Sequence, residues 1–276
     1  MLINSCAKIN LYLDVLKKRP DGYHEVDTLF STVSLHDSLK FVLTKKPEIK
    51  ILSNIQELAS ANNLVYRITK RIFEEFSVSD GIIIYLNKRI PVSAGLGGGS
   101  SNAAMTILAL NKLFNLSMEK GYIQNLAAEY GSDINFFLVG GLAQGKSRGE
   151  EVIPLPDQKP LDLLLVNPNL KVSSKEAYDL IDWKVKERSE LKLWFNRLES
   201  GIKNKYPIIN GLITDLKEMG ACEAIMSGSG STCIGHFDSR AKQDAAALYF
   251  KHRNFWTKAV KTIGRSKYQE CFLNLS

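Results

Sequence analysis

The feature that most constrains this chain is the glycine-rich stretch at residues 91–104, Pro-Val-Ser-Ala-Gly-Leu-Gly-Gly-Gly-Ser-Ser-Asn-Ala-Ala. Residues 81–86 before it form a short, β-branched apolar run of the kind found in buried strands. After it, the small and apolar residues from Ala103 to Phe114 recur at helical spacing, so they would share one face of a helix. The sequence therefore predicts a strand, a glycine loop and a helix in succession.

A loop of this composition is suited to binding an anion. Four glycines within positions 95–99 remove every Cβ except that of Leu96, so that backbone N–H groups can converge on a ligand. We expect Ser100 and Ser101 to cap the helix, whose positive end favours negative charge. These features favour a phosphate site over the alternative, a mobile glycine-rich turn.

The stretch differs from two common phosphate-binding motifs. A P-loop ends in Lys followed by Ser or Thr, whereas Gly99 here leads directly into Ser100 and Ser101. A dinucleotide-binding fingerprint needs a final glycine where this chain has Ser100. The loop therefore belongs to another class of phosphate site.

Composition sets the broad class of protein. With 276 residues, 45% hydrophobic and 24% charged, the chain reads as a globular protein of one large or two modest domains. No apolar run approaches the roughly 20 residues of a membrane span, and the N-terminus does not resemble a signal peptide, so we expect a cytoplasmic protein with no membrane partner. Cys6, Cys222, Cys233 and Cys271 form no Cys-x2-Cys pair, and we expect reduced packing residues.

The net charge of +7 is concentrated at the C-terminal end. Residues 240–276 hold eight Lys or Arg against two acidic residues, a local charge of +6. A basic region with interleaved aromatics can bind nucleic acid, but a solvated basic face explains it as well, and we expect no nucleic-acid partner. The positive field also suits a polyanionic small substrate.

Two polar pairs stand near the N-terminus. Residues 3–15 alternate apolar and polar side chains, which predicts a strand with Lys8 and Asn10 on a polar face of the kind that usually meets solvent. A turn at residues 17–22 precedes Tyr23 and His24, a pair that on such a turn is more often hairpin surface than ligand site. From the residues alone, neither pair indicates function.

Further along, structural explanations also compete with functional ones. Asn62 or Asn63 is a helix cap, and Asp133 follows a glycine and a serine in the manner of an N-cap. The prolines of residues 154–160 mark the expected boundary between domains 1–156 and 157–276. A second glycine loop is expected at residues 226–231 between two strands, and helices are predicted over residues 118–130, 188–200, 208–219 and 241–252.

Taken in order, these motifs resemble those of the GHMP small-molecule kinases, which include galactokinase and the homoserine, mevalonate and phosphomevalonate kinases. The loop resembles their Pro-x3-Gly-Leu-Gly-x-Ser-Ser-Ala-Ala pattern, with one extra glycine and Asn102 before the alanines. Residues 7–13 resemble the opening Lys-x-Asn-Leu element, residues 226–231 the third motif, and residues 131–137 the segment Gly-Ala-Asp-Val-Pro-Phe-Phe, with Asn135 in place of the proline.

The resemblance implies an α/β fold of two domains, a ribosomal S5 domain 2-like N-terminal domain and a ferredoxin-like C-terminal domain. It implies transfer of the γ-phosphoryl group of ATP to an alcohol, with Mg²⁺ expected. Asp133 would be the base that accepts the hydroxyl proton, and Lys8 would hold the hydroxyl. The residues implied to bind ATP are Asn63, Lys88, Pro91, Val92, Ser93, Ala94, Gly95, Leu96, Gly97, Gly98, Gly99, Ser100 and Ser101.

Residues 19–24 resemble one branch of this family in particular, through the pattern Arg-x-Asp-Gly-Tyr-His. The substrate of that branch is a cytidine diphosphate alcohol of non-mevalonate isoprenoid biosynthesis. The resemblance implies that Tyr23 stacks on the cytosine, that His24 hydrogen-bonds its edge, and that Asn10 helps to bind the substrate. The alternatives are a kinase of the same family for mevalonate or homoserine, and a basic nucleic-acid-binding protein on the same fold.

Overall fold

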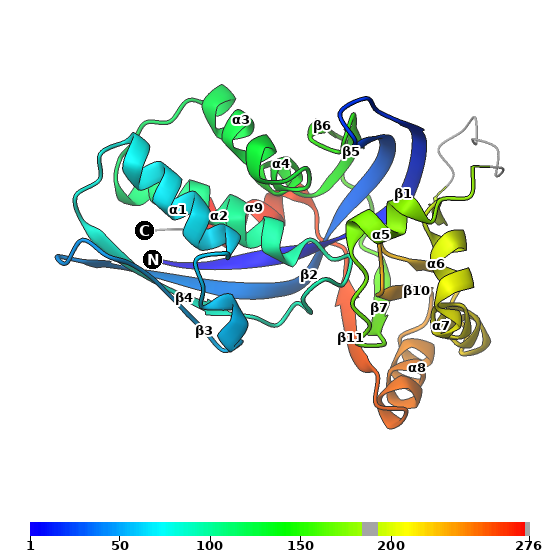
Figure 1. The fold of residues 1–276 in the computed structure, drawn as a ribbon. Coiled ribbons are helices and arrows are strands. Elements are labelled where there is room, and N and C mark those ends of the chain that lie inside the picture. The colour runs from blue at the N-terminus through cyan, green and yellow to red at the C-terminus, as the bar shows by residue number, and fades with distance from the viewer. Residues whose placement is uncertain (184–192, 274–276) are drawn as a thin grey trace.

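The computed structural model describes residues 1–183 and 193–273 of the chain, which form two lobes side by side (Figure 1). The elements are β1 (Leu2–Lys18), β2 (His24–Thr44), β3 (Ile49–Ser53), η1 (Gln56–Leu58), α1 (Leu64–Glu75), β4 (Gly81–Asn87), α2 (Gly98–Leu113), α3 (Lys120–Tyr130), α4 (Ile134–Val139), β5 (Leu142–Lys146), β6 (Glu151–Pro154), β7 (Asp162–Asn167), α5 (Ser174–Asp179), β8 (Phe195–Asn196), α6 (Glu199–Lys205), α7 (Pro207–Glu218), β9 (Glu223–Met226), β10 (Cys233–Phe237), α8 (Arg240–His252), β11 (Trp256–Lys261) and α9 (Arg265–Leu273).

The first lobe is a sheet covered by helices. Its strands lie in the order β3-β4-β2-β1-β8, and β5 and β6 extend it from one part of β2. β1 pairs antiparallel with β2 over its whole length, from the pair Leu2 and Lys40 to the pair Lys18 and His24, with three register shifts along the way. Helices α1–α4 and the C-terminal helix α9 lie on one side of this sheet (Figure 1).

The second lobe is a smaller antiparallel sheet in the order β11-β7-β10-β9, with helices α5–α8 packed around it. The two sheets meet in an apolar layer: Ile9 and Leu35 of the first sheet belong to the same cluster as Leu165 and Ile234 of the second. The mixed α/β architecture in two lobes is the one expected from the sequence. Within the described ranges, no helix is both long and apolar enough to cross a membrane.

Strand β1 runs through every part of this interior. Ile3 belongs to the core of the first lobe, Ile9 to the layer between the sheets, and Val15 to the core of the second lobe. The expectation that its polar face meets solvent is wrong, because Lys8 and Asn10 are only 4% and 3% exposed. Their apolar neighbours pack toward the second sheet, so the polar side chains point into a cleft that helices α2 and α4 close.

Two further expectations are corrected by the structure. The helix predicted over residues 188–200 is wrong in its described part, where β8 pairs with β1 and α6 begins only at Glu199; residues 188–192 lie outside the described residues. Helix α9 was not predicted at all. Its Tyr268 is fully buried in the core of the first lobe, although the proposed division at residues 156 and 157 assigns it to the second domain.

Candidate active site

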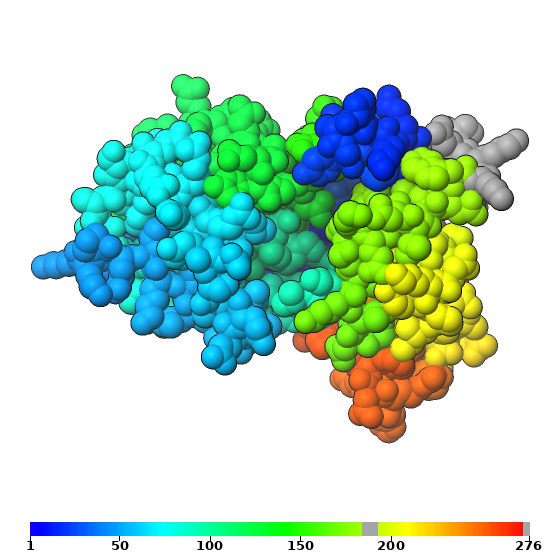
Figure 2. Space-filling view, viewed as in Figure 1, coloured from blue at the N-terminus to red at the C-terminus, as the bar shows by residue number. Residues whose placement is uncertain are grey.

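A cavity of about 980 Å³ lies between the lobes. Figure 2 shows the hollow between the cyan and green surface of the first lobe and the lime-green surface of the second, with the blue of the N-terminal strands at its bottom. All the residues predicted to bind ATP or substrate or to catalyse transfer line it, except Leu96 and Ser101. Those two are buried behind the loop, where the Leu96 carbonyl accepts a hydrogen bond from the Lys8 amide at 3.0 Å.

The glycine loop joins β4 to α2, as expected, and its glycines are needed for close packing. Gly95 and Gly97 both have positive φ, a conformation that glycine adopts without strain. A Cβ on Gly95 would lie 2.1 Å from the carbonyl oxygen of Ser227, and one on Gly97 would lie 2.9 Å from the ring of Phe137. The loop is therefore pressed between the second glycine loop and helix α4.

The prediction that serines cap the helix is wrong. Helix α2 begins at Gly98, its N-cap is Gly97 in the left-handed conformation, and no side chain caps it. Ser100 and Ser101 lie within the first turn, and the buried Ser101 hydroxyl accepts a hydrogen bond from Ser5 at 2.7 Å. The first N–H groups of a helix have no intrahelical acceptor. Because α2 begins with glycines and no side chain caps it, these N–H groups stay available at the cavity, as an anion site requires.

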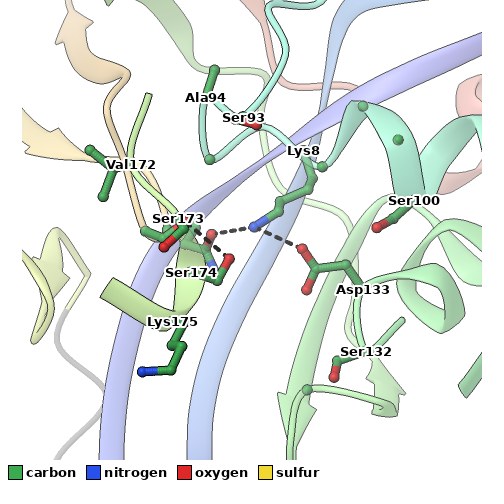
Figure 3. A pocket seen from close by; sticks show the side chains of 18 of the residues that line it. Lys8, Ser93, Ala94, Ser100, Ser132, Asp133, Val172, Ser173, Ser174 and Lys175 are labelled. Carbon is green, nitrogen blue, oxygen red and sulfur yellow. Dashed lines mark hydrogen bonds and ion pairs between the residues drawn. The ribbon is translucent and has the colours of Figure 1, made fainter. Parts of the chain in front are cut away.

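Lys8 and Asp133 face each other across the cavity floor. The Lys8 Nζ lies 3.3 Å from the Asp133 Oδ2, and Figure 3 shows the two side chains pointing toward each other. Asp133 occupies the N-cap position of α4 but makes no capping hydrogen bond, so the structural explanation for this residue does not hold. Its side chain keeps 32% exposure toward the cavity, while that of Lys8 keeps 5%.

A chain of hydrogen bonds fixes the Lys8 ammonium. The Nζ donates to the Asn10 Oδ1 at 2.7 Å, the Asn10 amide donates to the Thr28 hydroxyl at 2.7 Å, and that hydroxyl donates to the Tyr12 carbonyl at 2.6 Å. Asn10 is thus committed to Lys8 and Thr28, both of which line the cavity. Sequence reasoning missed Thr28, because only the pairing of β1 with β2, which sets Thr28 opposite Leu13, brings its hydroxyl beside Asn10.

Behind the loop lies a second buried network. The Lys88 Nζ donates to the Asp37 Oδ2 at 2.5 Å and to the Asn102 Oδ1 at 3.3 Å. Asp37 is fully buried, and its other oxygen accepts from the amides of Arg89 and Ile90, which precede the loop. Asn102, which departs from the family pattern, accepts from Lys88 and donates to Asp37 in this network. Asp37 was not predicted, since no local pattern links it to residue 88.

The remaining residue predicted to bind ATP, Asn63, both caps helix α1 and lines the cavity. Its Oδ1 accepts from the Val65 amide at 3.0 Å, which confirms the predicted cap of α1, and its Nδ2 donates to the Leu58 carbonyl at 2.7 Å. The residue also lines the cavity beside Leu64. Its role toward a ligand stays a prediction.

The other end of the cavity is aromatic. Tyr23 is 52% exposed, and the Arg148 guanidinium lies 4.7 Å from the centre of its ring. The His24 ring stacks on Tyr178 of α5, with centroids 4.8 Å apart. Burial, with the nearby charge of Lys18, lowers the pKa of His24, which favours a neutral ring. Sequence reasoning missed Arg148 and Tyr178.

The second glycine loop, residues 227–230, is held against the first from two sides. The Ser227 hydroxyl donates to the Gly95 carbonyl at 3.1 Å. The buried Asn196 donates through its Nδ2 to the carbonyls of Met226 and Gly228, each at 2.8 Å. Asn196 was not among the predicted site residues. It does not line the cavity, but its side chain fixes the position of the second glycine loop, which does.

Metal ligands are sparse. Among the described residues, no group of three or more His, Cys, Asp or Glu side chains is arranged to hold a metal ion. The cavity offers the Asp133 carboxylate and the Ser100 hydroxyl close to the glycine loop. This donor set fits Mg²⁺ only in the way that ion usually binds with nucleotides, through phosphate oxygens, water and one carboxylate.

Comparison with known proteins agrees with this geometry. The family models "GHMP kinases N terminal domain" and "GHMP kinases C terminal" match residues 63–141 and 174–254. The 4-diphosphocytidyl-2-C-methyl-D-erythritol kinase of Thermodesulfovibrio yellowstonii is 36% identical over 93% of this chain and 96% of its own. That of Geobacillus kaustophilus is 38% identical, over 95% and 97%.

A solved structure gives the same result. The crystal structure of a 4-(cytidine 5'-diphospho)-2C-methyl-D-erythritol kinase superposes with a TM-score of 0.83 at 29% identity, over 96% of this chain and all of the other. The two relatives and the solved structure each cover more than nine-tenths of this chain, and the family models include the glycine loop and parts of both lobes. The chain therefore belongs to the GHMP kinase family.

Proposed function

We propose that this enzyme transfers the γ-phosphoryl group of ATP to the 2-hydroxyl of 4-diphosphocytidyl-2-C-methyl-D-erythritol, a step of non-mevalonate isoprenoid precursor biosynthesis. The observation that carries the proposal is one cavity with three distinct regions. The start of α2 offers an anion site, Tyr23 and His24 offer an aromatic and hydrogen-bonding surface, and the Lys8–Asp133 pair lies on the floor. The relatives named above act on that substrate.

In the reaction that we propose, Asp133 accepts the proton of the attacking hydroxyl. Phosphoryl transfer depends mainly on positioning and charge stabilisation, and a positioned base contributes roughly 10² to 10⁴ in rate. Lys8 orients the hydroxyl and offsets the negative charge that develops on the transferred group. The Asn10–Thr28 chain keeps the ammonium in place, so no reorganisation is needed when the substrate binds.

ATP would bind with its phosphates at the N–H groups of Gly98, Gly99 and Ser100. Mg²⁺, when bound with ATP, would supply positive charge that neutralises the phosphate oxygens. Ser100 and Asp133 are the residues of this chain that would meet it. Ser101 is excluded from this role because its hydroxyl is buried and already bonded to Ser5.

The aromatic end would select the substrate. Tyr23 would stack on the cytosine, and the neutral His24, held in orientation by Tyr178, would hydrogen-bond its edge. This assignment disfavours mevalonate and homoserine, which carry no base to occupy that end. A nucleic-acid ligand, the other alternative, would leave the Lys8–Asp133 pair without a role.

The test is an incubation with Mg-ATP and three alcohols: the cytidyl alcohol, homoserine and mevalonate. We expect phosphorylated product from the cytidyl alcohol only, with the new phosphate on the 2-hydroxyl by ³¹P NMR. Comparable transfer to homoserine or mevalonate would refute the substrate assignment while keeping the kinase. The cytoplasmic location expected from the sequence stays a prediction.

A further inference from the structure

Two cysteines from opposite ends of the chain lie in contact. Cys6 is on β1 and Cys271 is on the C-terminal helix α9, and their sulfur atoms are 3.8 Å apart. The Cys6 side chain is buried at 2% exposure, whereas Cys271 is partly exposed. The spacing of cysteines in the sequence suggested only unrelated packing residues, because no local pattern brings position 271 beside position 6.

The contact is held by specific packing of α9 rather than by the two thiols. Tyr268, one turn before Cys271, is fully buried and donates its hydroxyl to the Phe137 carbonyl of α4 at 2.5 Å. Gly140 has positive φ, and a Cβ there would lie 1.9 Å from the Tyr268 ring. Helix α9 therefore has a fixed depth and rotation against α4, which keeps Cys271 over β1.

We propose that Cys6 and Cys271 form a reversible intramolecular disulfide when the enzyme meets a peroxide, a modification site separate from the phosphoryl-transfer cavity. In the first step the Cys271 thiolate attacks a peroxide oxygen, the O–O bond breaks, and a sulfenic acid and water form once a proton is taken up. In the second step the Cys6 sulfur displaces the sulfenic oxygen, which leaves as water. Two thiols and one hydrogen peroxide thus give one disulfide and two waters, so both sulfurs are oxidised and the peroxide is reduced.

The surroundings assign the two roles. Cys271 is the partner that solvent reaches, as the first attacking thiol must be. The hydrogen bond with Cys6 lowers the pKa of Cys271 to about 7, and the same hydrogen bond together with burial raises the pKa of Cys6. Cys6 is then the resolving thiol, shielded from peroxide and already in contact with the sulfur that it must reach.

The other two cysteines provide internal controls. Cys233 is fully buried in the second lobe, and burial raises the pKa of its thiol. Cys222 is exposed and lies between α7 and β9 in the second lobe. Trypsin separates the candidates cleanly, because Cys6 falls in residues 1–8, Cys271 in residues 268–276, and Cys222 with Cys233 in residues 218–240.

The experiment treats the reduced full-length enzyme with one equivalent of hydrogen peroxide and counts thiols after denaturation. We expect the wild type to fall from four thiols to two, Cys222→Ser from three to one, and Cys271→Ser to stay at three. The digest should contain residues 1–8 joined to residues 268–276 with the loss of two hydrogens, and dithiothreitol should release them. Cys271→Ser changes a partly exposed side chain, so it should fold.

Three results would overturn the proposal. The wild type and Cys222→Ser could retain all their thiols; Cys271 could gain two oxygens as a sulfinic acid while Cys6 stays free; or the joined peptide could contain residues 218–240. None of these readouts depends on turnover, so a failure here leaves the proposed kinase activity untouched.

Discussion

Two neighbouring glycines at the start of α2 have opposite surroundings, which makes them a matched pair for mutation to alanine. A Cβ on Gly98 would lie 2.9 Å from the Lys88 Nζ and 3.0 Å from the Ile90 Cγ2. A Cβ on Gly99 would meet only the Leu64 Cδ1, at 3.9 Å. Both positions have ordinary helical backbone, so the two substitutions differ chiefly in what the new methyl contacts.

We expect the two substitutions to change the free energy of unfolding in opposite directions. Replacing a helical glycine by alanine without strain stabilises a protein by roughly 0.4–1 kcal/mol, which is what we expect for Gly99→Ala. In Gly98→Ala the ammonium of Lys88 must move, although it is buried and held at 2.5 Å from Asp37. Overpacking of this kind costs about 1–3 kcal/mol. Because the gain from the unfolded chain is common to both alanines, we expect Gly98→Ala to be less stable than Gly99→Ala by about 1–3 kcal/mol, the cost of overpacking alone.

Chemical denaturation followed by circular dichroism measures the difference directly. ATP affinity, by calorimetry, adds a second readout, because the Gly99 methyl would project into the cavity and weaken ATP binding without loss of stability. If Gly98→Ala is as stable as Gly99→Ala, the Lys88–Asp37 pair is not the rigid support of the loop that the distances indicate.

Other expectations concern catalysis and binding. Asp133→Asn keeps the size of the side chain and removes its proton affinity, so single-turnover transfer should slow by roughly 10² to 10⁴ while ATP still binds; a near-normal rate would exclude a base. Tyr23→Ala should weaken the cytidyl substrate by about tenfold or more, since base stacking is worth roughly 1–3 kcal/mol, whereas Tyr23→Phe should be mild; equal KM values would contradict stacking. Asn196→Ala leaves two loop carbonyls unpaired and should cost about 1–3 kcal/mol of stability, measured by urea unfolding; an unchanged midpoint would show that water replaces the amide. His24 should titrate by NMR with a midpoint below 6.5, because burial disfavours its charged form. Its contribution to the free energy of unfolding is then present above pH 6.5 and is lost as the pH falls toward the lowered pKa. A midpoint above 6.5 would contradict this.

The sequence was most informative where function depends on a short contiguous motif. The glycine loop, its flanking strand and helix, and the Tyr23–His24 turn all follow from neighbouring residues. The error over Ser100 and Ser101 arose because Gly97 can adopt the left-handed conformation and so lets the helix begin earlier. Hydrophobic periodicity shows that a strand has two faces, but it does not show that the polar face of β1 is covered.

What the sequence could not supply were partners from distant segments. Asp37 under Lys88, Thr28 beside Asn10, and Cys271 over Cys6 are each determined by strand register or helix packing. A buried carboxylate such as Asp37 looks, in the sequence, like any polar residue in an alternating strand. Only the three-dimensional arrangement shows that it accepts from two backbone amides and an ammonium.

The path of β1 through all three apolar clusters has a mechanical consequence. Lobes that rotate about a hinge are joined by short flexible linkers, but here β1 and β2 remain hydrogen-bonded to each other from one lobe into the other (Figure 1). Bending the molecule at its waist would break that ladder and open the layer between the sheets. The shared ladder and the shared apolar layer therefore make the two lobes one rigid frame around the cavity.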